Sequence, residues 1–97
     1  MEEDEVWRAA RYHMLSILAG DRNSAMDDVV EDARAQAEPV FKALPAKVDE
    51  GEVLDITGDG HQYVVGLNYT GGESDIVVES VWEERDGQPR IVGIRLA

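Results

Sequence analysis

Few residues of this chain combine a reactive type with a position that could line a pocket. Tyr63, Ser80 and Trp82 fall on the apolar side of alternating segments, and His13 falls on the apolar stripe of a helical segment. A tyrosine and a histidine that face one pocket could transfer protons, since a general acid or base must point at its substrate. These four residues are therefore the candidate pocket residues. The plainer interpretation is that Tyr63 is a core tyrosine and His61 a surface residue beside a turn.

Neither a metal site nor a cofactor is predicted. Residues 55–60 read Asp-Ile-Thr-Gly-Asp-Gly, with acidic residues at the first and fifth positions of a calcium loop. The third position is Thr57, however, and the twelfth is Gly66, where a bidentate glutamate is required. Asp59 and His61 alone are too few ligands for a metal. The chain has no cysteine, and it contains no glycine-rich phosphate loop or nucleophile elbow.

The composition is strongly acidic, with 21 Asp and Glu against 9 Lys and Arg and a formal net charge of −12. Such a surface repels nucleic acid and anionic membranes, so neither is expected as a partner. The acidic surface could bind a basic protein or mimic a nucleic acid. The simpler interpretation is that it keeps the protein soluble. No basic leader, cysteine or apolar run of about 20 residues is present, and we expect a cytoplasmic protein.

Apolar residues at three- and four-residue steps predict two N-terminal helices. The first spans 5–19 and ends at Gly20, a residue typical of helix C-termini. The second begins near Asn23 or Ser24, either of which can cap it. Its apolar stripe continues past Pro39, where the helix must kink or a second piece must begin.

From Glu52 onward the apolar period changes from 3.6 to 2 residues. Glycine-containing turns divide this half into four strands, predicted at 52–57, 61–70, 74–85 and 90–97. The sequence therefore predicts one α+β domain, residues 1–97, in which two N-terminal helices pack on one face of a four-stranded antiparallel meander sheet.

Two-residue turns and the apolar alternation set the expected strand register. The expected pairs are Ile56–Tyr63, Leu54–Val65, Tyr63–Ser80, Val65–Val78, Leu67–Ile76, Trp82–Val92, Ser80–Ile94, Leu96–Val78 and Glu79–Arg95. All three hairpins then agree on which face is apolar. The expected core face consists of Leu54, Ile56, Tyr63, Val65, Leu67, Ile76, Val78, Ser80, Trp82, Val92, Ile94 and Leu96.

The same register sends the carboxylates of Asp55, Asp75, Glu79 and Glu83 to the opposite face. No strand carboxylate is then left beneath the helices, so we do not expect a catalytic site there. The outer face is also more apolar than a fully solvated face needs to be. The candidate interface residues on it are Val64, Val77, Glu79, Val81, Ile91 and Arg95.

Two segments resemble the nuclear transport factor two-like, or cystatin-like, superfamily. They are the Leu18-Ala19-Gly20-Asp21 step and the closing hairpin 81–94, in which a tryptophan strand, an Asp-Gly turn and an Ile-Val strand follow one another. The resemblance implies N-terminal helices before a curved antiparallel sheet, in a chain without the extra strand and third helix of typical members. The superfamily includes isomerases, epoxide hydrolases, cyclases and non-catalytic modules, so the resemblance leaves the function open.

Three hypotheses about function follow. The first is a non-catalytic interaction module that forms a homodimer or binds another protein through the outer face of the sheet. The second is an acidic inhibitor, such as an immunity protein or a nucleic-acid mimic, whose binding to a basic target would depend steeply on salt. The third is a small-molecule binder or enzyme that uses a pocket near Tyr63, Ser80 and Trp82, which an open cavity at Ser80 would favour.

Overall fold

Helix α1, Glu3–Leu18, is the first element of the computed structural model, which describes residues 1–97. The side chain of Glu5 accepts a hydrogen bond of 3.2 Å from the backbone N–H of Glu2 at the helix start. The acidic first turn also favours the helix dipole. The buried residues of α1 are Val6, Ala10, His13, Met14 and Ile17, the stripe that the sequence predicts.

The second helical region is divided into α2, Arg22–Asp27, a 3₁₀ turn, Glu31–Ala33, and α3, Arg34–Ala43. No second helical piece begins at Pro39, because Pro39 lies inside α3; the chain leaves the helix at residues 28–30 instead. There the N–H of Val30 donates to the carbonyl of Ile91 at 2.9 Å, and the N–H of Ile91 donates to Asp28 at 2.8 Å. Pairing with a distant strand, which a local pattern does not reveal, interrupts the helix.

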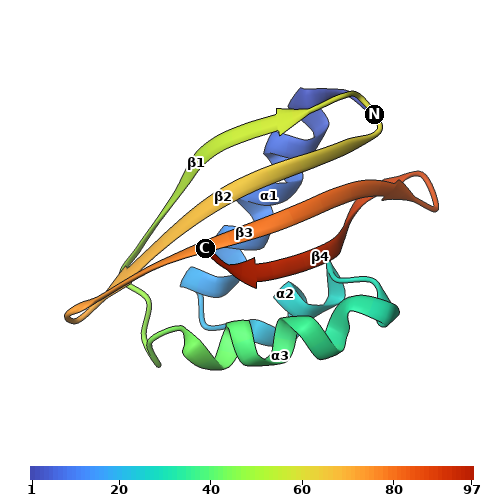
Figure 1. Cartoon of the computed structure of the whole chain (residues 1–97). Coiled ribbons are helices and arrows are strands. Elements are labelled where there is room, and N and C mark those ends of the chain that lie inside the picture. The colour runs from blue at the N-terminus through green and yellow to red at the C-terminus, as the bar shows by residue number, and fades with distance from the viewer.

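The second half of the chain forms a four-stranded antiparallel sheet in the order β1-β2-β3-β4. The strands are β1, Glu50–Gly58; β2, Gln62–Gly71; β3, Ser74–Arg85; and β4, Gln88–Leu96. Figure 1 shows α1 behind β1 and β2, and α3 along the lower side of the molecule near β4. The predicted α+β architecture, with N-terminal helices on one face of a four-stranded antiparallel meander, is confirmed, but the chain has three α-helices where two were expected.

The first two hairpins are shifted by two residues from the predicted register. Val65 pairs with Ile56 and Ser80, and Trp82 pairs with Tyr63, which was expected opposite Ser80. The second turn lies one residue later than predicted, because Gly71 still pairs with Ser74 inside the sheet. A shift of two residues keeps every side chain on its predicted face.

A β-bulge in β1 overturns part of the predicted core face. Leu54 and Asp55 together lie opposite Gly66, since the register changes between Val53 and Ile56. One extra residue on a strand moves the preceding side chains to the other face. Val53 therefore packs against the core, whereas Leu54, predicted to be in the core, is 46% exposed.

A second irregularity, in β4, corrects the prediction for Ile91. Glu79 pairs with Arg95 and Ser80 with Ile94, as expected, but the register changes after Val81 and Trp82 pairs with Ile91 in place of Val92. Ile91 is fully buried in the core, so it cannot belong to the outer interface to which the sequence pattern assigned it.

The core lies between the helices and the inner face of the sheet. Trp82 and Val78 are buried beneath the helices, as predicted. Leu96, also predicted in the core, is 46% exposed at the end of the edge strand. None of the helices is both long and apolar enough to cross a membrane.

Candidate functional site

Three of the four predicted pocket residues meet in the core. The indole N–H of Trp82 donates a hydrogen bond of 2.9 Å to the hydroxyl of Ser80, which donates one of 2.9 Å to the carbonyl of Val65. The ring of His13 stands edge-on to that of Trp82, with 6.0 Å between the ring centroids. The polar groups of Ser80 and Trp82 are thus satisfied within the protein, as is usual for a packed core.

The fourth predicted pocket residue, Tyr63, lies beside Trp82 on the neighbouring strand. Its hydroxyl donates a hydrogen bond of 2.9 Å to the carbonyl of Met1, so it fastens the N-terminus to the sheet. Burial, together with the carboxylates of Glu2 and Glu3, raises the pKa of Tyr63. No hollow in the molecule is lined by Tyr63, Ser80, Trp82 or His13.

A carboxylate that the sequence analysis missed reaches the buried histidine. The Nδ1 atom of His13 lies 2.9 Å from Oδ2 of Asp28, and the His13 side chain is only 1% exposed. Strand register assigns faces only to residues of the sheet, whereas Asp28 comes from the end of α2. Asp28 can reach His13 because the helix is interrupted at residues 28–30. The apolar pattern of the sequence runs through this point without a break, so it does not predict the interruption.

Tyr69 is a second polar residue that the analysis did not single out as a site. Its hydroxyl is buried without a hydrogen-bond partner, which is uncommon in folded proteins. Burial, with a smaller contribution from the charge of Asp28, raises the pKa of Tyr69 well above its usual range. The helix side of the sheet therefore holds a buried His13 that pairs with a partly exposed Asp28, and a buried Tyr69 hydroxyl; no hollow is lined by His13 or Tyr69.

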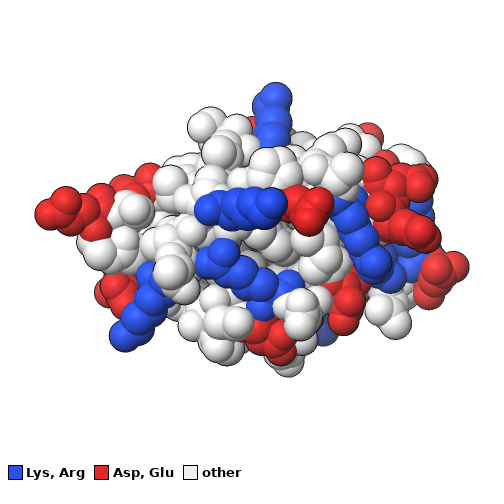
Figure 2. All heavy atoms as spheres, turned by 90° about the horizontal axis from the view of Figure 1, so that it is seen from below, with Lys and Arg blue, Asp and Glu red and all other residues white.

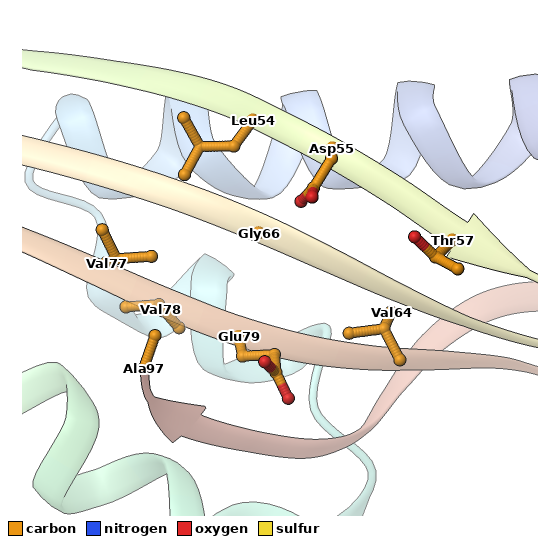
Figure 3. A pocket seen from close by; sticks show the side chains of 9 residues that line it. All are labelled: Leu54, Asp55, Thr57, Val64, Gly66, Val77, Val78, Glu79 and Ala97. Carbon is orange, nitrogen blue, oxygen red and sulfur yellow. The ribbon is translucent and has the colours of Figure 1, made fainter.

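The largest hollow lies on the opposite, helix-free face of the sheet and has a volume of about 510 Å³ (Figure 3). It is lined by Leu54, Asp55, Thr57, Val64, Gly66, Val77, Val78, Glu79 and Ala97. Gly66 lies among these residues and contributes no side chain of its own. Asp55 from β1 and Glu79 from β3 flank the hollow, so it has an apolar floor with two carboxylates at its rim.

Five of the six candidate interface residues lie on this outer face: Val64, Val77, Glu79, Val81 and Arg95. Val64 pairs directly with Val81, and both are partly buried. Arg95 donates two hydrogen bonds to Oε1 of Glu79, at 2.8 and 3.1 Å. The outward placement predicted for Asp55 and Glu79 holds, because both line the outer hollow.

The basic side chains are unevenly placed. Figure 2 shows Lys and Arg side chains spread over the face seen from below, with acidic side chains at its two ends and also between the basic ones. Two arginines bind carbonyl groups at helix ends: Arg22 donates to Phe41 and Pro45 at 2.7 Å, and Arg90 donates to Asp27 at 2.7 Å. No three His, Asp or Glu side chains are grouped to hold a metal ion.

The arrangement of helices before a four-stranded antiparallel sheet matches a solved structure over its whole length. A crystal structure of an NTF-2-like protein of unknown function from Burkholderia xenovorans LB400 superposes on this chain with a TM-score of 0.67 at 20% sequence identity. The match covers 100% of this chain and 86% of that one.

This chain has the NTF-2-like fold. The resemblance seen in the closing hairpin is thereby confirmed at the level of the fold. No family model and no curated protein matches the sequence. Because the NTF-2-like fold is used by proteins of unrelated function, the function must be argued from the surfaces of this chain.

Proposed function

We propose that this chain is a non-catalytic interaction module that pairs with a second copy of itself through the outer face of its sheet. The observation that carries the proposal is the position of the largest hollow: it lies on the outer face, whereas the helix side is filled by packed side chains. A small-molecule site at Ser80 is not supported, because Ser80 is fully buried and no hollow reaches it.

The apolar content of the outer face supports self-association. Val64, Val77 and Val81 form an incompletely buried patch, and Leu54 at its edge is 46% exposed. Each Å² of apolar surface removed from water contributes roughly 25 cal/mol. A second copy would cover these side chains with identical ones, as closed two-fold pairs commonly do.

The charges on the outer face favour one orientation. β1 carries Glu50, Glu52 and Asp55 without a basic residue, whereas β4 carries Arg90 and Arg95 without an acidic one. A two-fold axis parallel to the strands places β1 of one copy over β4 of the other. Arg95, which is 74% exposed, then lies on the side of the acidic strand of the second copy. The alternative axis, across the strands, would place β1 over β1 and bring like charges together.

Sedimentation velocity at micromolar concentration tests the proposal. The net charge of −12 on each copy opposes association, so the dimer should strengthen as salt screens this repulsion. Val77→Lys should give a monomer, because it places an ammonium group at the centre of the contact. Leu15→Lys is the matched control, since Leu15 is a 42% exposed apolar residue on α1. A clean 10.7 kDa monomer of the unmodified chain at both low and high salt would rule out the dimer.

A further inference from the structure

Other segments of the chain hydrogen-bond to one edge of the sheet, β4, but not to the other edge, β1. At the β4 edge, Val30 and Asp28 hydrogen-bond the backbone of Ile91, and the side-chain oxygen of Gln36 accepts a bond of 3.4 Å from the N–H of Ile94. At the opposite edge, the backbone of β1 hydrogen-bonds only β2. An open edge presents unpaired N–H and C=O groups to which another strand can add.

A groove lies beside this open edge, between the first turns of α1 and the middle of β1. Its volume is about 270 Å³. It is lined by Glu3, Asp4 and Trp7 of α1 and by Val53, Leu54, Asp55 and Ile56 of β1. Trp7 is 42% exposed and Leu54 is 46% exposed, so apolar surface lies open to solvent here among three carboxylates. The groove can receive an apolar side chain whose neighbours are basic.

On the other face, the same edge carries a second, wholly polar hollow of about 350 Å³. It is lined by Glu50, Gly51, Glu52, Asn68 and Thr70. Neither Glu50 nor Glu52 forms an ion pair within the chain, and β1 has no basic residue that could reach them. Both sides of the edge therefore carry carboxylates that form no ion pair, while Arg11 of α1 places its guanidinium 5.7 Å from the centroid of the Trp7 ring.

From these observations we infer that the β1 edge binds a short extended segment of another protein, rich in lysine or arginine, which adds to the sheet as a fifth strand. Side chains alternate along such a strand. Basic residues on one side meet Glu50 and Glu52, while an apolar residue on the other side enters the groove beside Trp7. A second copy of this chain is excluded as the occupant of this edge, because its own β1 would bring the same negative charges.

The bulge limits the length of the added strand. Residues 54 and 55 break the regular ladder, so continuous pairing extends along 50–53 before the partner reaches the groove. A bulge and charged residues on an edge are also the devices that prevent two identical edges from aggregating. The bulge and the acidic side chains of β1 disfavour pairing with an acidic strand or with a long flat one. They still allow pairing with a short basic strand.

The probe for the test is a synthetic six-residue peptide that alternates lysine with valine, with blocked ends, followed by fluorescence anisotropy. We expect saturable binding that Glu50→Lys with Glu52→Lys weakens by about tenfold or more. The matched control is Glu38→Lys with Glu84→Lys, which makes the same change in net charge at two exposed positions, on α3 and near the far end of β3. It should change the affinity by less than about twofold.

A second peptide separates strand addition from simple charge attraction. It has the same lysines but prolines in place of the valines, which removes the N–H of every second residue and disfavours a regular strand. We expect it to bind at least about tenfold more weakly than the valine peptide. Equal binding of both peptides, equal effects of the two charge variants, or no binding of the valine peptide would each overturn the inference. Glu50 and Glu52 also lie on the proposed dimer face, so sedimentation of the unmodified chain and of both charge variants without peptide is measured first. It tests the outer face separately from peptide binding.

Discussion

The Nδ1 atom of His13 in α1 lies 2.9 Å from the Oδ2 atom of Asp28, at the point where α2 ends. The His13 ring is held between Phe41 of α3 and Trp82 of β3, each at 6.0 Å between ring centroids. This side chain thus links α1 to the end of α2, to α3 and to the sheet. The pair fixes the chain just before Val29 and Val30, which pair with β4.

We expect Asp28→Asn to destabilise the protein by about 1–2 kcal/mol, because it weakens a hydrogen bond between a buried imidazole and a charged acceptor. Urea unfolding followed by circular dichroism measures the change. Asp27→Asn is the control, since the neighbouring Asp27 carboxylate makes no hydrogen bond. A loss of stability in Asp27→Asn as large as that in Asp28→Asn would contradict a specific role for the His13 contact.

Trp82→Ala should cost roughly 3–5 kcal/mol, because it empties a large site in the middle of the core and leaves the Ser80 hydroxyl without its indole partner. Trp82 is fully buried, whereas Trp7 is 42% exposed. Trp7→Ala should therefore cost less than about 1 kcal/mol. Thermal and urea unfolding of both variants compare the two sites, and equal losses would show that Trp82 does not anchor the core.

Tyr69 should make the protein sensitive to alkaline pH. Burial raises the pKa of its hydroxyl, so the folded state holds this proton more tightly than the unfolded state does. The stabilisation is complete below the unfolded pKa near 10 and is lost as the pH rises beyond it. We expect Tyr69→Phe to be close to neutral at pH 7, since the hydroxyl has no partner, and to lose less stability than the unmodified chain between pH 9 and about pH 11.

Tyr63→Phe is the natural comparison for that experiment. It removes the hydrogen bond to the Met1 carbonyl and should cost about 1 kcal/mol at pH 7. If Tyr69→Phe were the more damaging of the two at neutral pH, the Tyr69 hydroxyl would have to make a bond in solution, contrary to its unpartnered position.

The observed turn between β2 and β3 predicts that substitution costs more stability at Gly71 than at Gly72. A Cβ atom on Gly71 would collide with the backbone carbonyl of Lys47, so Gly71→Ala should cost about 1–3 kcal/mol or more. Gly72 has a φ of +59° with open space around it, so Gly72→Ala should cost only about 1 kcal/mol. Melting temperatures of the two variants decide between this turn and the one expected from the Gly71-Gly72 pair. A larger loss in Gly72→Ala than in Gly71→Ala would favour the register predicted from the sequence.

Local patterns were sufficient for much of the architecture. The three- and four-residue spacing from Val6 to Ile17 identified the buried side of α1, and two-residue alternation identified the strands and the face on which Trp82 lies. These properties depend on helix and strand periods, which neighbouring residues establish by themselves. The side of the sheet on which Asp55 and Glu79 lie was predictable for the same reason, since an error of two residues in register preserves the face.

Long-range packing decided the rest. The bulge at Leu54 and Asp55 and the one-residue change near Val92 each reverse side chains, and both depend on how the twisted sheet fits against the helices. The break at Val29 likewise requires a hydrogen-bond partner in β4, more than sixty residues away. The sequence by itself therefore determined which residues share a periodic face. Only the tertiary structure decided that the helix side is filled and that the hollow opens on the outer face, because packing volume is a property of the assembled layers and not of either pattern alone.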